Sequence, residues 1–230
     1  TRKKPCACAT RPARVPEATD LQPLHVVFGA SGYIGSNLVP ALLRRGRRVR
    51  ATARNIEVLE GRGWAGAELA RADALDPATL PAALAGADVA YYLVHSMAAG
   101  SHFGAIDRVA AANFARAAAA AGVRRIVYLG GLIPPNPRSQ HLLSRAETGE
   151  VLRQGAVPVT EVRAGMIVGP GSAAYEVIRD LVNHLPVMVT PSWVRSVSTP
   201  IALPDLLAYL SAVAELPEAA GRILDAGGPE

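Results

Sequence analysis

The sequence predicts an α/β fold, a doubly wound parallel sheet of the Rossmann type in a single domain. Half of its 230 residues are apolar, which is enough to fill a core of that size. Short apolar segments alternate along the chain with longer segments of helical periodicity, the pattern of a parallel sheet covered by helices on both faces. A glycine-rich turn joins the first apolar segment to the first helical one.

Strands and helices alternate regularly in the first half of the chain. Residues 24–28 are apolar and end at a glycine, so we expect the first strand there. A helix at 34–45 follows, with leucines on one face, and Gly46 ends it. Further strands are expected at 49–53, 68–71 and 89–93, and further helices at 77–84 and 103–121.

The alanine-rich helix at 103–121 is expected to bury one face. Gly122 ends this helix. Its apolar positions recur at helical spacing: Ile106, Val109, Ala110, Phe114 and Ala117.

The alternation continues to the end of the sequence. Strands are expected at 125–129, 157–163 and 222–225, and helices at 142–154, 174–185 and 205–215. We interpret residues 24–230 as one Rossmann domain whose small C-terminal elements lie on the substrate side.

Residues 1–23 differ from the rest and are expected to be a disordered basic leader. They mix Arg, Pro, Ala and Thr without a period and hold five of the 24 basic residues but only two of the 19 acidic ones. The net charge of +5 therefore belongs mostly to this segment. The body lacks the basic, aromatic-rich face of a nucleic-acid-binding protein, so no nucleic-acid partner is expected.

Cysteine and lysine usage excludes several kinds of chemistry from the body. Both cysteines, Cys6 and Cys8, lie in the leader, so the body has no disulfide, cysteine nucleophile or thiolate metal site, and we expect no metal. Lys3 and Lys4 are the only lysines, which excludes a Schiff base and a P-loop. No apolar run approaches the roughly 18 residues of a membrane helix, so we expect a cytoplasmic protein without a membrane partner.

The turn at residues 29–35 reads GASGYIG and carries the functional interpretation. A dinucleotide pyrophosphate needs a sharp turn, close approach of the backbone and free amides at a helix start. Gly29, Gly32 and Gly35 meet these three needs, with a strand before them and a helix after. We therefore expect a dinucleotide cofactor.

The residue that follows the second strand indicates which dinucleotide binds. An acid there would bind the ribose 2′-hydroxyl, whereas an arginine accepts a 2′-phosphate. The sequence at 51–55 is ATARN, with Arg54 and no acid. This favours NADP, with NAD as the alternative, and a solvated loop arginine is the other interpretation of Arg54.

Several segments together resemble a known family. They are GASGYIG, the pair Asp73-Ala74, the helix and strand AANFARAAAAAGVRRIVYLGGL, and the ending PEAAGRILDAGGPE. These resemble the atypical short-chain dehydrogenases/reductases of the NmrA-like, NAD(P)-binding kind, over about residues 24–230. The resemblance implies a Rossmann fold and an NAD(P)-binding oxidoreductase.

The resemblance also assigns cofactor-binding residues. It places Asp73 and Ala74 beside the adenine, and Arg54 at the 2′-phosphate. Leu93, Val94, His95 and Ser96 would pass along the ribose, and Asn113 would be the family's helix asparagine. The pyrophosphate would lie against Gly29, Ser31, Gly32, Tyr33, Ile34 and Gly35. Asp73 as a turn cap and Asn113 as a satisfied buried amide are the alternatives.

The sequence departs from the family in its catalytic set. Typical members carry a serine after the fifth strand and a tyrosine with a lysine four residues later. Here the strand ends in Gly130-Gly131, and His141 and Arg145 stand in place of the tyrosine and the lysine. His141 can exchange a proton near neutral pH, and Arg145 can hold the nicotinamide ribose. His95 follows the fourth strand at the same cleft, so it is a third catalytic candidate.

Two functions remain open on this evidence. The first is an NADP-dependent oxidoreductase that reduces a small carbonyl or enone. The second is a non-catalytic NAD(P)-sensing regulator or assembly factor that a protein partner recognises; the lost serine, tyrosine and lysine favour it. Trp193, Arg195 and the pair Pro200-Ile201 are candidates for a substrate mouth, with packing as their alternative role.

Overall fold

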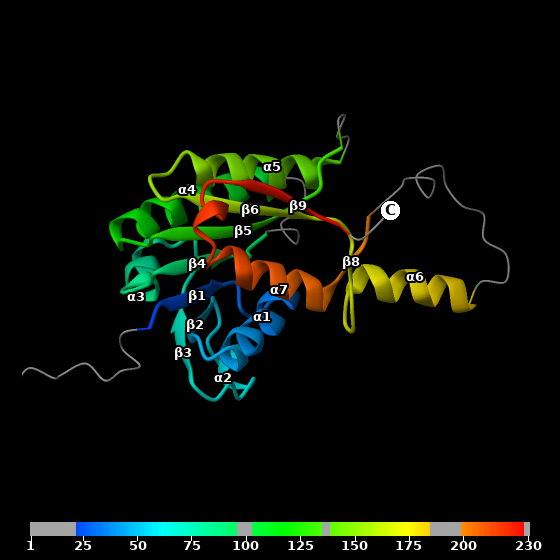
Figure 1. The fold of residues 1–230 in the computed structure, drawn as a ribbon, viewed down its shortest axis with the longest axis horizontal. Helices are drawn as coiled ribbons and strands as arrows, with labels where there is room; N and C mark the ends of the chain where they lie inside the picture. Colours follow the sequence, from blue (N-terminus) through cyan, green and yellow to red (C-terminus); the bar gives the residue numbers. More distant parts are fainter. Residues whose placement is uncertain (1–21, 96–102, 135–138, 185–198, 228–230) are drawn as a thin grey trace, which may run out of the picture.

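The computed structural model describes residues 22–95, 103–134, 139–184 and 199–227. It confirms the doubly wound parallel sheet (Figure 1). The 7-stranded sheet has the order β3-β2-β1-β4-β5-β6-β9, and every neighbouring pair is parallel. Residues 1–21, which hold most of the expected leader, lie outside the described residues.

The elements agree with those expected, to within three residues at each end. The strands of the large sheet are β1 (Leu24–Phe28), β2 (Arg48–Ala53), β3 (Ala67–Arg71), β4 (Val89–Tyr92), β5 (Arg125–Gly131), β6 (Val159–Ala164) and β9 (Ile223–Ala226). The helices are α1 (Tyr33–Arg44), α2 (Glu57–Glu60), α3 (Leu80–Leu84), α4 (Phe103–Ala120), α5 (Gln140–Arg153), α6 (Ala173–His184) and α7 (Leu203–Val213). A small second sheet pairs β7 (Ile167–Val168) with β8 (Ile201–Ala202). The sequence did not predict α2, β7 or β8, which are too short to show a period.

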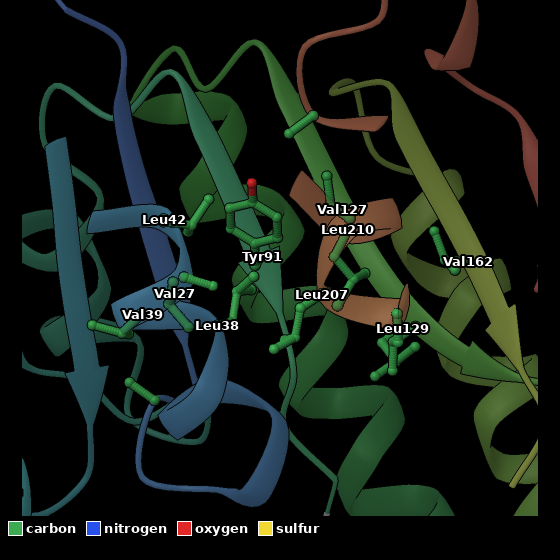
Figure 2. Close-up of a cluster of buried hydrophobic side chains, with 14 of the residues drawn as sticks. Val27, Leu38, Val39, Leu42, Tyr91, Val127, Leu129, Val162, Leu207 and Leu210 are labelled. Carbon is green, nitrogen blue, oxygen red and sulfur yellow. The ribbon is translucent and has the colours of Figure 1, made fainter. Parts of the chain in front are cut away.

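Successive side chains of the strands enter two separate cores, one on each face of the sheet. Val27, Tyr91 and Val127 belong to the core beneath α1 and α7. Figure 2 shows leucines of both helices packed over these strands. Phe28 and Tyr92 face the opposite way, into the core beneath α3 and α4. Burial on both faces explains why the strands read as continuous apolar runs.

The buried face of α4 differs from the one expected. Val109 is 54% exposed, so its assignment to the apolar stripe was wrong. Asp107 is only 3% exposed, and Ala111, Phe114 and Ala118 continue the buried row at spacings of three and four residues. The buried stripe of α4 is therefore rotated about the helix axis relative to the expected one, and it includes the carboxylate of Asp107.

The carboxyl ends of the parallel strands lie at one edge of the sheet, where ligands bind in folds of this kind. The loops after β1, β2, β4, β5 and β6 all leave from that edge. In Figure 1, α6 projects away from the body beyond this edge, next to β8. Within the described ranges, no helix is long and apolar enough to cross a membrane.

Candidate functional site

The glycine loop is a tight turn that joins β1, β2 and α1. Gly29 has φ +95°, a conformation that only glycine adopts readily. The amides of Gly29 and Ala30 both donate to the carbonyl oxygen of Thr52, at 3.2 and 2.9 Å. A Cβ on Gly35 would collide with the carbonyl oxygen of Gly29. Gly29 and Gly35 are therefore required by the turn itself.

Gly32 has a different role, because nothing in the fold crowds it. A Cβ there would meet only the carbonyl oxygen of Gly29, at an ordinary 3.4 Å. Gly32 is the N-cap of α1, makes no side-chain cap and is followed by no acidic residue in the first turn. The first amides of a helix lack intrahelical acceptors and attract anions. Together with the exposed Ser31, this open helix start fits a dinucleotide pyrophosphate.

Tyr33 and Ile34 lie behind the loop. Ile34 packs against the core beneath α1 and α7. The Tyr33 hydroxyl is buried with no hydrogen-bond partner among the described residues, and a Cβ on Gly169 would lie 3.0 Å from it. Burial raises the pKa of Tyr33 above its ordinary value. Both side chains thus connect the glycine loop to the protein, and their backbone amides are among the first of α1, which lack intrahelical acceptors.

Arg54 directly follows β2 and is exposed. It lies two residues from Thr52, whose carbonyl oxygen anchors the glycine loop. The Asn55 side chain accepts from the amide of Glu57, the first residue of α2, at 3.0 Å. A cationic side chain therefore follows the end of β2, the position that distinguishes a 2′-hydroxyl from a 2′-phosphate in dinucleotide-binding sheets of this kind.

The segment after β3 is a hydrogen-bonded turn. Asp73 accepts from the amide of Leu75 at 2.9 Å, so its carboxylate caps the turn as the alternative interpretation held. Ala74 is buried, and its carbonyl oxygen accepts from the Asn113 side chain at 2.8 Å. Asn113 is thus a satisfied buried amide that fixes this loop from α4.

Leu93 and Val94 continue β4 past the sheet and lie against Gly29. A Cβ on Gly29 would come within 3.1 Å of the Leu93 carbonyl group and 3.2 Å of the Val94 side chain. The glycine loop and the end of β4 are therefore in close contact. Ser96, the last residue of the expected ribose-binding segment, lies outside the described residues.

A cavity of about 710 Å³ opens at the carboxyl ends of β5 and β6. Its lining is largely apolar, with His141 and Arg145 as its ionisable side chains among the described residues. The lining residues are Gly130, Gly131, Leu132, Ile133, Pro134, Ser139, His141, Leu142, Arg145, Ala164, Gly165, Met166, Ile167 and Thr199. Cavities of this size with few polar groups suit small organic ligands.

His141 and His95 contact each other, although they are 46 residues apart. Nδ1 of His141 lies 2.8 Å from Nε2 of His95. Nδ1 of His95 lies 2.6 Å from a carboxylate oxygen of Asp107, and the Ser144 hydroxyl donates to the same oxygen at 3.1 Å. Burial lowers the pKa of both histidines below 6.5, and neighbouring Arg145 lowers it further. Among the described lining residues His141 faces the cavity, and His95 stands behind it.

Arg145 lies under Gly131 at the cavity wall. One terminal nitrogen donates to the carbonyl oxygen of Leu129 at 2.6 Å, while the buried Nε has no hydrogen-bond partner among the described residues. The Tyr128 hydroxyl donates to the backbone carbonyl of Arg145 at 2.9 Å and fixes this turn of α5. An unpaired buried donor is costly, so this nitrogen fits a ligand oxygen such as a ribose hydroxyl.

Sequence reasoning missed Asp107 and Ser144. Asp107 could have been found as a carboxylate on the buried row of α4. Ser144 shares the inner face of α5 with His141, Arg145 and Thr148, at spacings of three and four residues. A polar row on the inner face of a helix is the signal that was available.

The residues expected at the substrate mouth have different outcomes in the structure. Ile201 is 3% exposed and belongs to a core, which confirms the packing alternative. Trp193 and Arg195 lie outside the described residues. Pro200 is exposed. Met166, Ile167 and Thr199 line the cavity.

A family model described as NAD(P)H-binding matches residues 29–182, which is more than half of the chain. Three curated relatives are reductases by name. Cinnamoyl-CoA reductase 1 of Oryza sativa subsp. japonica is 37% identical over 48% of this chain and 36% of its own length. The (4-alkanoyl-5-oxo-2,5-dihydrofuran-3-yl)methyl phosphate reductase of Streptomyces griseus is 32% identical over 70% of this chain and 56% of its own. The chloroplastic divinyl chlorophyllide a 8-vinyl-reductase of Zea mays is 27% identical over 97% of this chain and 59% of its own. The chain thus spans less than two thirds of each relative.

Solved structures share the fold at low sequence identity. An epimerase from Methanothermobacter thermautotrophicus superposes with a TM-score of 0.75 at 17% identity, over 90% of this chain and 72% of its own. A short-chain dehydrogenase/reductase superfamily protein from Agrobacterium tumefaciens with bound NAD gives a TM-score of 0.69 at 20% identity, over 89% and 77%. The glycine loop, the strand order and the matched residues agree: the chain belongs to the NAD(P)H-binding family of atypical short-chain dehydrogenases/reductases.

Proposed function

We propose that the protein is an NADP-dependent oxidoreductase that reduces a small carbonyl or enone. The observation that carries this proposal is the cavity, where His141 and Arg145 meet at the same sheet edge that holds the glycine loop. The reductase names of the curated relatives support the reaction class. The apolar lining supports a substrate with little charge.

The residues of the chain divide the task of holding the dinucleotide. The amides at the start of α1 would bind the pyrophosphate, with Gly32 allowing its close approach and Ser31 beside it. The Nε of Arg145, which has no hydrogen-bond partner in the part of the chain that the structure describes, would bind the nicotinamide ribose. When bound, the cofactor supplies the hydride, and the protein orients it against the substrate.

Preference for NADP is assigned to Arg54. An exposed guanidinium beside the glycine loop pairs with a 2′-phosphate through charge-assisted hydrogen bonds. No acid stands at the end of β2 to bind a 2′-hydroxyl in its place.

His141 is the residue proposed to exchange a proton with the substrate oxygen. It lines the cavity, whereas Arg145 holds its proton too firmly for acid–base work. His95 acts through His141 and is assigned a positioning role.

A second candidate function is a non-catalytic NAD(P) sensor that a protein partner recognises. The observation in its favour is that Gly131, His141 and Arg145 occupy the places of the family's serine, tyrosine and lysine. In that case the bound dinucleotide would order a surface for the partner. The cytoplasmic location, in either case, stays a prediction.

Titration with NADPH and NADH, followed by nicotinamide fluorescence, tests the proposal. It is combined with a scan of carbonyl, enone and quinone acceptors for oxidation of the cofactor. We expect tighter binding of NADPH and turnover with at least one apolar acceptor. Binding without turnover on any acceptor would favour the sensor, and absence of binding would overturn both functions.

A further inference from the structure

We propose that Asp107 sets the direction of the hydrogen bonds in the chain Asp107–His95–His141, so that His141 presents an unprotonated Nε2 to the cavity and acts there as a base. The catalytic meaning of this inference rests on the proposed function. The protonation pattern itself does not, because it follows from the protein's own groups.

The three groups form a continuous row that crosses three elements. Asp107 lies on α4, His95 follows β4 and His141 is in the first turn of α5. The two contacts measure 2.6 Å from Asp107 to His95 and 2.8 Å from His95 to His141. The Asp107 side chain is 4% exposed and that of His95 is 14% exposed, so little water competes for these contacts.

A carboxylate fixes the order of donors along such a row. An ionised carboxylate accepts hydrogen bonds and donates none, and the Ser144 hydroxyl already donates to the same Asp107 oxygen. Nδ1 of His95 must therefore carry the proton. In a neutral imidazole the other nitrogen is then an acceptor, so Nε2 of His95 accepts from Nδ1–H of His141. Nε2 of His141 is left with a lone pair.

Burial, more than any neighbouring charge, favours neutral rings for both histidines at neutral pH. Burial and the Arg145 guanidinium on α5 lower the pKa of each histidine below 6.5, against the opposing influence of Asp107 on α4. The pattern above therefore describes the resting state. A proton gained at lower pH would turn His141 into an acid, with its charge stabilised through the row by Asp107.

The resting row suits the oxidation of an alcohol. Nε2 of His141 would take the hydroxyl proton, and an oxidised nicotinamide, when bound, would supply the acceptor for the hydride of the carbinol carbon, so that the C–O bond becomes a carbonyl. Reduction is the reverse and needs the row to hold one extra proton, which His141 gives to the carbonyl oxygen. The rate of reduction should therefore fall as the pH rises through the pKa of the two coupled histidines, His95 and His141, while the rate of oxidation should rise.

Nitrogen NMR of the ¹⁵N-histidine-labelled protein at pH 8 tests the pattern without any substrate or cofactor. The chain has five histidines, so single His→Gln variants assign the signals. We expect Nε2 of His141 to give the shift of an unprotonated nitrogen and its Nδ1 that of a protonated one.

Asp107→Asn is the decisive variant. The asparagine amide can donate to Nδ1 of His95, which reverses every hydrogen bond in the row and places a proton on Nε2 of His141. Ser144→Ala is the matched control, because it removes one hydrogen bond to Asp107 but keeps the carboxylate and so the pattern. His95→Gln breaks the row and should leave His141 as a mixture of tautomers, should Asp107→Asn fail to fold.

The outcomes separate the two proposals. A protonated Nε2 on His141 in the wild-type protein at pH 8, or an unchanged pattern in folded Asp107→Asn, would overturn the assignment. A row with the expected pattern in a protein that binds no dinucleotide would leave the assignment standing and refute the proposed function instead.

Discussion

Asp107 and Glu161 are two buried carboxylates with similar surroundings and different consequences. Asp107 is 3% exposed and Glu161 is fully buried, and each is held between basic or hydroxyl side chains. Glu161 on β6 pairs with Arg153 of α5 and, at 2.8 Å, with Arg163. Asp107 pairs with His95 and Ser144.

The partners decide what each carboxylate can do. Arginine does not release its proton at physiological pH, so the Glu161 cluster is a fixed ionic contact that ties α5 to the sheet. Histidine exchanges protons in that range, and the Asp107 row ends at the wall of the cavity. A buried carboxylate held by two side chains thus ties α5 to the sheet at Glu161, whereas at Asp107 we propose that it determines which nitrogen of His141 is reactive.

Removal of Glu161 should give the largest effect on stability. Glu161→Ala leaves two partly buried guanidinium groups without their carboxylate and opens a cavity, so we expect a loss of about 3–5 kcal/mol in unfolding free energy. Asp107→Asn keeps the shape and the hydrogen-bonding capacity, so its loss should be about 1 kcal/mol. Urea unfolding of both variants measures the two losses in unfolding free energy. Equal losses would contradict the proposed difference between the two carboxylates.

His25 sharpens the comparison, because it is a buried histidine far from the cavity. It lies at the amino end of the sheet, 3.2 Å from the Tyr91 hydroxyl, and burial lowers its pKa to about 4. The unfolded chain takes up a proton near pH 6.5 that the folded chain refuses, so stability is complete above that pH and falls toward pH 4. We expect a loss of about 3 kcal/mol from this group.

Unfolding of His25→Leu across pH 4–7 measures that contribution. The variant should be less stable at pH 7, because Tyr91 loses its hydrogen-bond partner, but its stability should fall less steeply with acid. A slope identical to that of the wild-type protein would show that His25 is not the group responsible.

Gly149 tests how tightly the Glu161 cluster is packed. Alanine usually stabilises a helix interior relative to glycine, but a Cβ on Gly149 would lie 2.7 Å from a Glu161 oxygen. We therefore expect Gly149→Ala to lower the unfolding free energy by about 1–3 kcal/mol. At Gly104 on α4 a Cβ meets nothing closer than 3.8 Å, so Gly104→Ala should be neutral or stabilising. Thermal melts of both variants measure the two effects.

Substitution of Arg54 should give the smallest effect of the series. It compares an exposed arginine with the ion-paired arginines of the Glu161 cluster. Unlike Arg153 and Arg163, it is exposed beside the glycine loop. Arg54→Ala should weaken NADPH binding about tenfold, close to 1.4 kcal/mol, and leave NADH binding unchanged. Arg44→Ala, an exposed arginine at the far end of α1, serves as the control. Equal losses for both nucleotides would contradict the assignment of the 2′-phosphate to Arg54.

The sequence predicted the sheet and the glycine loop because both depend on local signals. Gly29 and Gly35 are required by a turn seven residues long, and the strands read as apolar runs. The row behind the cavity joins residues 95, 107 and 141, and sequence spacing alone does not show such a contact. The phase of α4 was misjudged at Val109, and that error concealed Asp107 on the buried face.

Gly32→Ala, compared with the wild-type protein by NADPH titration, tests the central claim most directly. The fold leaves room for a Cβ at this position, so unfolding free energy should change by about 1 kcal/mol or less. A pyrophosphate resting on the helix start would meet that Cβ, so we expect at least about tenfold weaker binding, or a loss of 1.4 kcal/mol. A variant that binds NADPH as tightly as the wild-type protein, or a wild-type protein that binds no dinucleotide, would contradict the account.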